Sequence, residues 1–170
     1  MLLVALAAYA LDQVTKVLAV QHLTGKAPVD VLGSWLRLDL LRNPGAAFST
    51  GVSWTPVITL VAIAASVVVL VFAFRVRHRG WAVALGLLLA GVVGNLTDRM
   101  LRTPGPFRGH VVDFVALPHW PVFNVADVCI DVAGALLVLL LLRGASFDGS
   151  PRETAPDEGE ESSERGTGPS

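Results

Sequence analysis

The chain has 170 residues, of which 53% are hydrophobic, and its mean hydropathy is +0.61. Such a composition is unusual for a water-soluble globular domain and typical of a small protein with several membrane-spanning segments. The net charge of −1, with no block of basic residues, gives no indication of nucleic-acid binding, and a single cysteine excludes an intrachain disulfide.

Four apolar stretches are long enough to cross a bilayer as helices, which requires roughly 20 residues each. They cover about residues 1–21, 56–74, 81–99 and 122–142. The first stretch has a competing interpretation as a signal peptide, because Ala8-Tyr9-Ala10 is similar to a cleavage site. It has no charged start, however, and its apolar pattern continues to Val20, which favours a retained span. The expected fold is an all-α polytopic membrane protein with four transmembrane helices in residues 1–143.

The charged segments predict the orientation of these spans. Arg75, Arg77 and Arg79 crowd the link between the second and third spans, which the positive-inside rule places in the cytoplasm. Both termini are then cytoplasmic, and the two other connecting segments lie outside. Residues 144–170 are rich in glycine, proline, serine and glutamate, and we expect them to form a disordered acidic tail in the cytoplasm.

The outer segment between the first two spans is expected to contain β structure. Leu36, Leu38 and Leu40 alternate with Arg37 and Asp39, which is the pattern of a half-buried strand. A small sheet lying on the membrane surface would fit this pattern.

Two acidic residues beside the spans give the strongest indication of function, since a carboxylate next to hydrocarbon is energetically costly. Asp113 lies in the segment VVDFV, and Asp127 lies near the start of the fourth span. If they meet, their mutual repulsion raises one pKa and lets the pair share a proton. Pro118 and Pro121 prevent one helix from carrying both acids, so the connecting loop has to fold back. Such a pair can activate water, which predicts an intramembrane aspartic hydrolase.

Other polar residues gather at the same ends of the spans. Asn95, Asp98 and Arg99 share one face of the third span, where they either support a site or end the helix, with Asp98 paired to Arg102. Asn124 is placed to cap the fourth span.

Three charged residues lie deeper in the spans. Asp12 and Lys16 have the i, i+4 spacing of an ion pair, which is either purely structural or orients the site. Asp131 lies one turn beyond Asp127 and is either a supporting acid or a lumen-facing group. No histidine spacing matches a strong metal-ligand pattern, and serine-hydrolase and nucleotide-binding motifs are absent from the sequence. A small transporter or proton-relay subunit and a structural scaffold remain the alternatives to a hydrolase.

Five segments, in this order, resemble the bacterial lipoprotein signal peptidase family, or signal peptidase II: DQVTK (12–16), NPGAAFS (43–49), GNLTDR (94–99), RGHVVDF (108–114) and FNVAD (123–127). The resemblance implies that Asp113 and Asp127 are a catalytic aspartate pair. It also implies that the site is lined or braced by Asp12, Lys16, Asn43, Gly45, Asn95, Asp98, Arg99, Asn124 and Ala126.

The same resemblance implies a substrate and a location. The family removes the signal peptide from prolipoproteins whose future N-terminal cysteine carries diacylglycerol, and it cuts just before that cysteine in the bacterial plasma membrane, near the outer leaflet. The family requires no cofactor and no metal, and globomycin is its known type of inhibitor. Ala90-Gly91 stands where the family usually has a Gly-Gly pair, and both Asp131 and the acidic tail lie outside the family's motifs.

Overall fold

The computed structural model describes residues 1–45, 55–73 and 75–147. These ranges form four helices and three strands: α1 (Leu2–Leu23), β1 (Val29–Leu32), β2 (Leu36–Asn43), α2 (Thr55–Ala73), α3 (Arg79–Leu101), β3 (Val111–Ala116) and α4 (Val125–Leu142). All four helices are long and apolar enough to span a membrane, so the predicted helical fold is confirmed. The last helix begins at Val125 rather than near residue 122, because Asn124 caps it.

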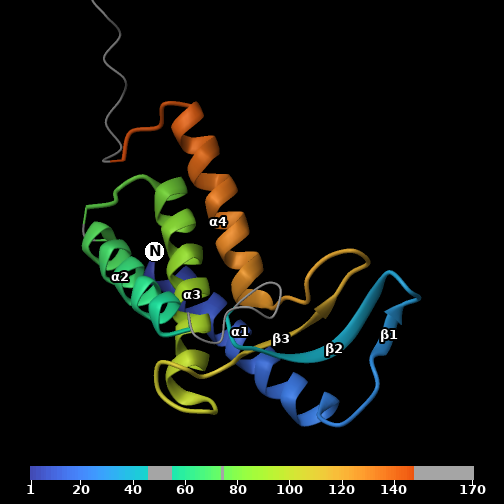
Figure 1. Cartoon of the computed structure of the whole chain (residues 1–170). Coiled ribbons are helices and arrows are strands. Elements are labelled where there is room, and N and C mark those ends of the chain that lie inside the picture. The colour runs from blue at the N-terminus through green and yellow to red at the C-terminus, as the bar shows by residue number, and fades with distance from the viewer. Residues whose placement is uncertain (46–54, 74, 148–170) are drawn as a thin grey trace, which may run out of the picture.

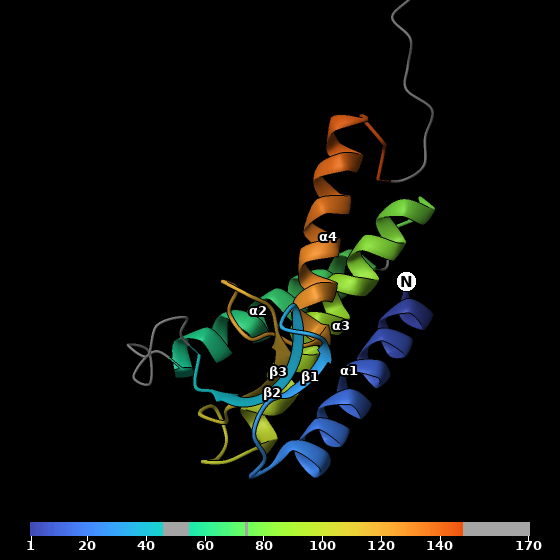
Figure 2. The same ribbon diagram turned by 90° about the vertical axis from the view of Figure 1, so that its right-hand side faces the viewer.

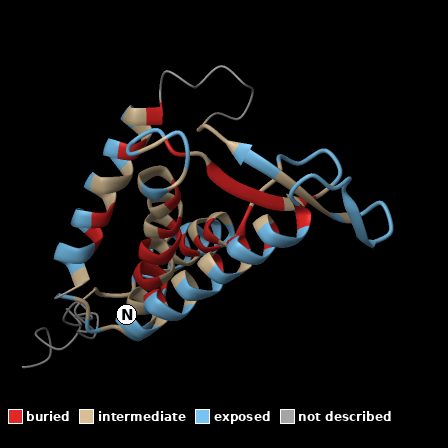
Figure 3. Ribbon diagram, turned by 90° about the horizontal axis from the view of Figure 1, so that it is seen from below, coloured by how far each residue is buried: buried red, intermediate tan, exposed pale blue. Residues whose placement is uncertain are grey.

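The central element of the bundle is α3, against which α1, α2 and α4 all pack (Figure 1). Small residues on α3 make these approaches possible. An added Cβ on Gly86 would lie 2.9 Å from Met1 O, and one on Gly91 would overlap Ala126 O. Buried residues concentrate on α3 and β3, whereas the outward faces of α1, α2 and α4 are largely exposed and apolar (Figure 3). That distribution suits helices surrounded by lipid.

The sheet has the order β1-β2-β3, and both pairs of strands are antiparallel. It lies beside the C-terminal half of α1 (Figure 2), where Val112 and Phe114 pack against Ala19 and Leu23. The predicted strand over residues 36–40 is therefore present within β2.

The strand β3 corrects one expectation, because the sequence places Asp113 in a connecting loop and the structure places it in a strand. Five of its six residues are buried, so apolar side chains occupy both faces and no alternating pattern marks the segment as a strand. Its partner β2 precedes it by the whole of α2 and α3. The acid at Asp113 is thus carried by a sheet and not by an irregular loop.

The chain continues to pack after the end of α4. The carbonyl of Ala145 accepts a hydrogen bond of 3.0 Å from Trp81 Nε1. The ring of Phe147 meets the rings of Phe72 and Trp81 edge to face, with centroids 5.9 and 5.3 Å away. Residues 144–147, predicted as the start of the tail, therefore belong to the packed region, and residues 148–170 lie outside the described ranges.

Candidate active site

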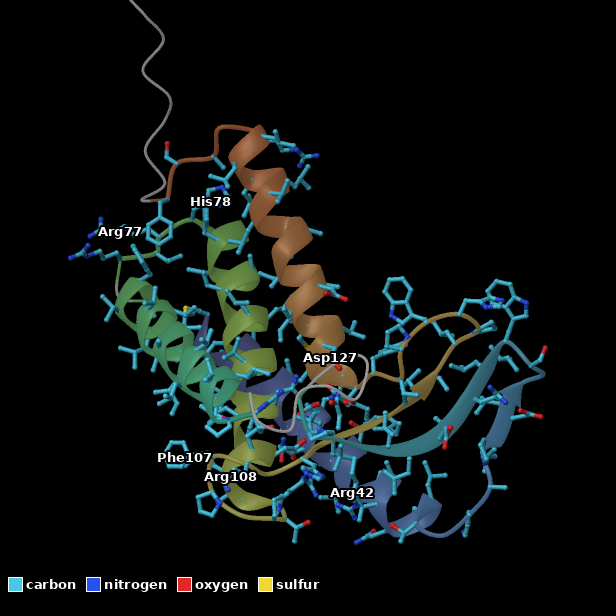
Figure 4. All side chains as sticks on the ribbon, in the orientation of Figure 1. Arg42, Arg77, His78, Phe107, Arg108 and Asp127 are labelled. Atoms are coloured by element: carbon cyan, nitrogen blue, oxygen red, sulfur yellow. The ribbon has the colours of Figure 1, made fainter. Side chains whose placement is uncertain are left out.

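Polar side chains from α1, β2, α3, β3 and α4 converge where the sheet meets the helices. Asp127 lies at this end of the molecule, whereas Arg77 and His78 lie at the opposite end of the bundle (Figure 4). The convergence brings Asp113 and Asp127 into one hydrogen-bonded network. The fold-back that Pro118 and Pro121 require is made by β3 and the segment that follows it.

Asn124 connects the two aspartates. Its Nδ2 donates to Asp113 Oδ1 at 2.6 Å, while its Oδ1 accepts the backbone N–H of Asp127 at 3.1 Å. The backbone N–H of Asn124 in turn donates to Asp127 Oδ2 at 3.0 Å. These reciprocal bonds form a capping box at the start of α4. The same residue therefore begins the helix and fixes the relative position of the two carboxylates.

A second asparagine holds each aspartate from another element. Asn43, at the end of β2, donates from Nδ2 to Asp113 Oδ2 at 2.9 Å. Asn95, on α3, donates from Nδ2 to Asp127 Oδ1 at 2.8 Å. Each carboxylate consequently accepts hydrogen bonds at both oxygens, which fixes its plane.

The two carboxyl groups differ in their surroundings. Asp113 is only 2% exposed, whereas Asp127 is half-buried. Burial raises the pKa of Asp113 to about 6; the hydrogen bond from Asn43 opposes this rise, and the negative charge of Asp127 adds to it. Asp113 therefore keeps a proton more readily than an ordinary carboxyl group does.

A cluster of charged side chains on α1 and at the end of α3 adjoins the network. Lys16 is fully buried, and its Nζ lies 3.0 Å from Asp12 Oδ2, 2.9 Å from Asp98 Oδ2 and 2.9 Å from Asn95 Oδ1. Three acceptors match the three N–H donors of an ammonium group. Asp98 also pairs with Arg102, so two carboxylates face two cations. Through Lys16 and Asn95, α1 helps to hold the carboxylate on α4.

Asp12 joins α1 to the start of α4. Its Oδ1 accepts the backbone N–H of Ala126 at 2.9 Å. An added Cβ on Gly94 would lie 2.6 Å from Asp12 Oδ2, so only glycine leaves room for this carboxylate beside α3. The predicted ion pair thus also contacts the start of α4. Gln13, not singled out from the sequence, donates to Asp12 Oδ2 at 3.0 Å and to the carbonyl of Gly94 at 3.2 Å.

The turn after β2 explains the glycine of the second motif. The N–H of Gly45 donates to Asn43 Oδ1 at 2.9 Å, and the φ of Gly45 is 114°. A residue with a side chain is strained at this φ. Thr55 Oγ1 donates to the carbonyl of Pro44, which ties the turn to α2. The rest of this motif, residues 46–49, lies outside the described residues.

Arg99 stands beside the same network. Its Nη1 donates to the carbonyl of Asn95 at 3.2 Å, and its charge interacts with those of Asp98, Asp113 and Asp127. Among the described residues, Arg99 Nε is the buried side-chain nitrogen that lacks a hydrogen-bond partner. A buried donor without a partner is uncommon, and it is available to a ligand.

Asp131 does not join this network. It is exposed on α4, and no hydrogen bond or ion pair is formed by its side chain within the part of the chain that the structure describes. In the same ranges, no group of three or more histidine, cysteine or acidic side chains is placed to hold a metal ion.

Comparison with known proteins identifies the family. The family model described as "Signal peptidase (SPase) II" matches residues 4–143. The chain belongs to this family. Its members include the lipoprotein signal peptidase of Streptomyces coelicolor, which is 48% identical over 147 residues covering 86% of this chain and 72% of the relative. That of Mycobacterium avium is 46% identical over 158 residues, covering 93% and 87% of the two chains.

A solved structure described as a bacterial membrane enzyme superposes on this chain with a TM-score of 0.73 and 28% identity, covering 89% of this chain and 92% of the other. A second structure with the same description, at 27% identity, also gives a TM-score of 0.73. The predicted membership of the signal peptidase II family is confirmed, and with it an aspartic peptidase that removes signal peptides from lipid-modified prolipoproteins. The transporter and scaffold alternatives are thereby set aside.

Proposed function

We propose that Asp113 and Asp127 are the catalytic pair with which this signal peptidase hydrolyses the peptide bond before the lipidated cysteine. The observation that carries the proposal is the connection through Asn124, which hydrogen-bonds both residues at 2.6–3.1 Å. Aspartic peptidase chemistry requires two carboxyl groups that share one proton. These two are the acids that asparagine amides hold together.

The surroundings assign a role to each carboxyl group. Asp113, whose pKa is raised to about 6 by burial, carries the shared proton. Asp127 is half-buried at the N-terminus of α4, where backbone N–H groups stabilise a negative charge. Ionised Asp127 takes a proton from water as the water oxygen attacks the scissile carbonyl. Protonated Asp113 donates a hydrogen bond to the carbonyl oxygen, and the proton taken from water passes to the leaving amine as the C–N bond breaks.

Arg99 supplies a contact to the substrate in this scheme. Its unpaired Nε is a donor in a buried environment, next to the two aspartates. A backbone carbonyl of the signal peptide is an acceptor that satisfies it. Asn43, Asn95 and the Lys16 cluster act as positioning groups, because they hold the carboxylates rather than the reacting atoms.

The arginine-rich link between α2 and α3 supports the location of the site. It lies at the end of the bundle opposite Asp127 (Figure 4), and the positive-inside rule assigns it to the cytoplasm. Both termini are then cytoplasmic and the aspartates lie near the outer leaflet of the bacterial plasma membrane. The two acyl chains of the substrate hold it at that depth, since each buried CH₂ contributes about 0.8 kcal/mol. A globomycin-type inhibitor occupies the same site.

Cleavage of a diacylglyceryl-modified prolipoprotein by the purified full chain in detergent tests this proposal. The wild type should release the signal peptide with a new N-terminus at the lipidated cysteine, and globomycin should block the release. Asp113→Asn and Asp127→Asn should each lower the rate by about 10²–10⁴-fold or more, because general acid–base catalysis is lost. Asp131→Asn, one turn along α4 and outside the network, is the matched control and should retain activity.

Thermal unfolding of each variant separates a catalytic loss from a folding loss. Appreciable turnover by a folded Asp113→Asn or Asp127→Asn variant would remove that residue from the pair.

A further inference from the structure

Two tryptophans stand at the end of the sheet that lies away from the aspartates. In the register of β2 with β3, Arg37 pairs with Ala116, so the residue before β2 and the residues after β3 share this end. The N–H of Trp35 donates to Leu32 O at 3.1 Å, and the N–H of Trp120 donates to Leu117 O at 3.3 Å. Each tryptophan is therefore presented by its own tight turn.

The two turns enclose a hollow of about 480 Å³, lined by Ser34, Trp35, Leu117, Pro118, His119 and Trp120. Trp35 is 74% exposed and Trp120 is 63% exposed, and the neighbouring Val31 and Leu32 are exposed as well. None of the described residues that line the hollow carries a carboxylate. Large exposed apolar side chains around a concave surface are typical of a binding site.

The backbone at this place is strained in a way that serves the presentation of Trp120. His119 has a φ of 60° and follows Pro118, which is the conformation of a type II turn whose third residue is usually glycine or asparagine. A histidine there carries a steric cost, and such conformations persist at binding surfaces where the surroundings enforce them. The turn thus holds an indole in a fixed, exposed position.

We propose that Trp35 and Trp120 clamp the head-group region of an outer-leaflet phospholipid. The sheet is built directly onto the membrane helices, with β3 leading into α4 and its buried face against α1, so its free end stays beside the bilayer. An indole has an apolar ring and one N–H donor, a combination that places tryptophan at the level of the head groups. Because none of the described lining residues is acidic, the hollow presents no carboxylate to repel a lipid phosphate.

The clamp is connected to both halves of the active site. Phe123 bridges to Val115, with hydrogen bonds of 2.8 Å and 3.0 Å between their backbones. The loop that carries Trp120 is therefore closed at its base. Asp113 precedes one side of this base by two residues, and Asn124 directly follows the other. A lipid held at the loop consequently fixes the depth in the membrane at which the two aspartates lie.

Tryptophan fluorescence in vesicles tests the lipid contact without any assay of activity, so its outcome does not depend on the proposed catalytic roles. The full chain carrying Trp54→Phe and Trp81→Phe retains Trp35 and Trp120 as its only tryptophans, and excitation at a wavelength that Tyr9 does not absorb selects their emission. In vesicles of phosphatidylethanolamine and phosphatidylglycerol, lipids brominated near the glycerol should quench this emission more strongly than lipids brominated near the chain ends. Quenching by aqueous iodide without quenching by brominated lipid would overturn the proposal, as would quenching by deep bromines alone.

A second measurement tests the coupling to the site and rests on the proposed function. The Trp35→Ser/Trp120→Ser double variant should lower cleavage in vesicles by about three- to tenfold and cleavage in detergent by less than about twofold, since only the bilayer contact is removed. Arg37→Ser, an exposed change in β2 two residues after Trp35, is the control and should leave both rates unchanged. An equal loss in vesicles and in detergent would show that the indoles act on the fold or on the substrate, and the coupling would be refuted. Circular dichroism confirms that the double variant is folded.

Discussion

Replacement of Asn43 by alanine should move the pH dependence of cleavage in a direction that the geometry determines. Burial and the charge of Asp127 raise the pKa of Asp113 to about 6, and the hydrogen bond from Asn43, 2.9 Å long, works against them. That bond stabilises the ionised carboxylate. Without it Asp113 binds its proton more tightly, so its pKa rises further.

The size of the change follows from the bond. A hydrogen bond to a charged group is worth about 1.5–3 kcal/mol, and about 1.4 kcal/mol corresponds to one pH unit. Asn43 is half-buried, so water entering the vacated space replaces part of the interaction. We therefore expect a displacement of about one pH unit rather than two.

The sign follows from the proposed role of Asp113 as the proton carrier. Activity that requires protonated Asp113 is present below its pKa and is lost as the pH rises through it. In the wild type kcat/KM should decline above about pH 6, and in Asn43→Ala this alkaline decline should begin about one unit higher.

The assay is kcat/KM for a lipidated prolipoprotein across the pH range, because this parameter reports the free enzyme. The readout is the pH at which kcat/KM declines. A general weakening of the site lowers kcat/KM at every pH and leaves that pH unchanged. Arg42→Ala, an exposed neighbour on β2, should leave the position unchanged. A decline that stays in place or moves to lower pH in Asn43→Ala would refute the assignment of Asp113 as the proton carrier.

Three further changes test the scaffold by thermal unfolding in detergent. Lys16→Met leaves two buried carboxylates without their shared cation and should cost about 3–5 kcal/mol; an unfolding temperature equal to that of the wild type would contradict this. Gly94→Ala places a Cβ 2.6 Å from a carboxylate oxygen and should cost about 1–3 kcal/mol, whereas Gly134→Ala meets nothing within 4 Å and should be tolerated. Truncation after Phe147 should preserve stability and activity, and truncation after Gly144 should lower stability because the aromatic contacts are lost.

The helices and their approximate limits could be predicted because a span needs only length and apolar composition. The strand β3 could not. Its partner lies far away in the sequence, since the hydrogen bond between Asn43 and Asp113 joins residues 70 positions apart. Burial on both faces removes the alternation that reveals a half-exposed strand such as β2.

The residues around the aspartates were likewise predictable only in part. The spacing of Asp12 and Lys16 predicts a pair within one helix, and the structure contains it. Nothing in that spacing indicates that the pair faces Asp98 on another helix. The requirement for glycine at position 94 arises only from that packing, because the neighbouring carboxylate comes from α1. Spacing along one helix therefore predicts an ion pair within that helix, whereas the contacts of the pair with other helices depend on the tertiary fold.

The groups that hydrogen-bond the aspartate side chains favour the proposed sharing of a proton between them. Asn43, Asn95 and Asn124 are neutral amides, whereas the cations Lys16 and Arg102 are bonded to other carboxylates. A cation bonded directly to either aspartate would favour the ionised form of both and would oppose the sharing of a proton. An amide fixes the plane of the carboxyl group without adding a positive charge beside it. Asp113 can therefore have a pKa of about 6 although both of its oxygens accept hydrogen bonds. Replacing one of these asparagines by lysine should therefore abolish activity more completely than replacing it by alanine.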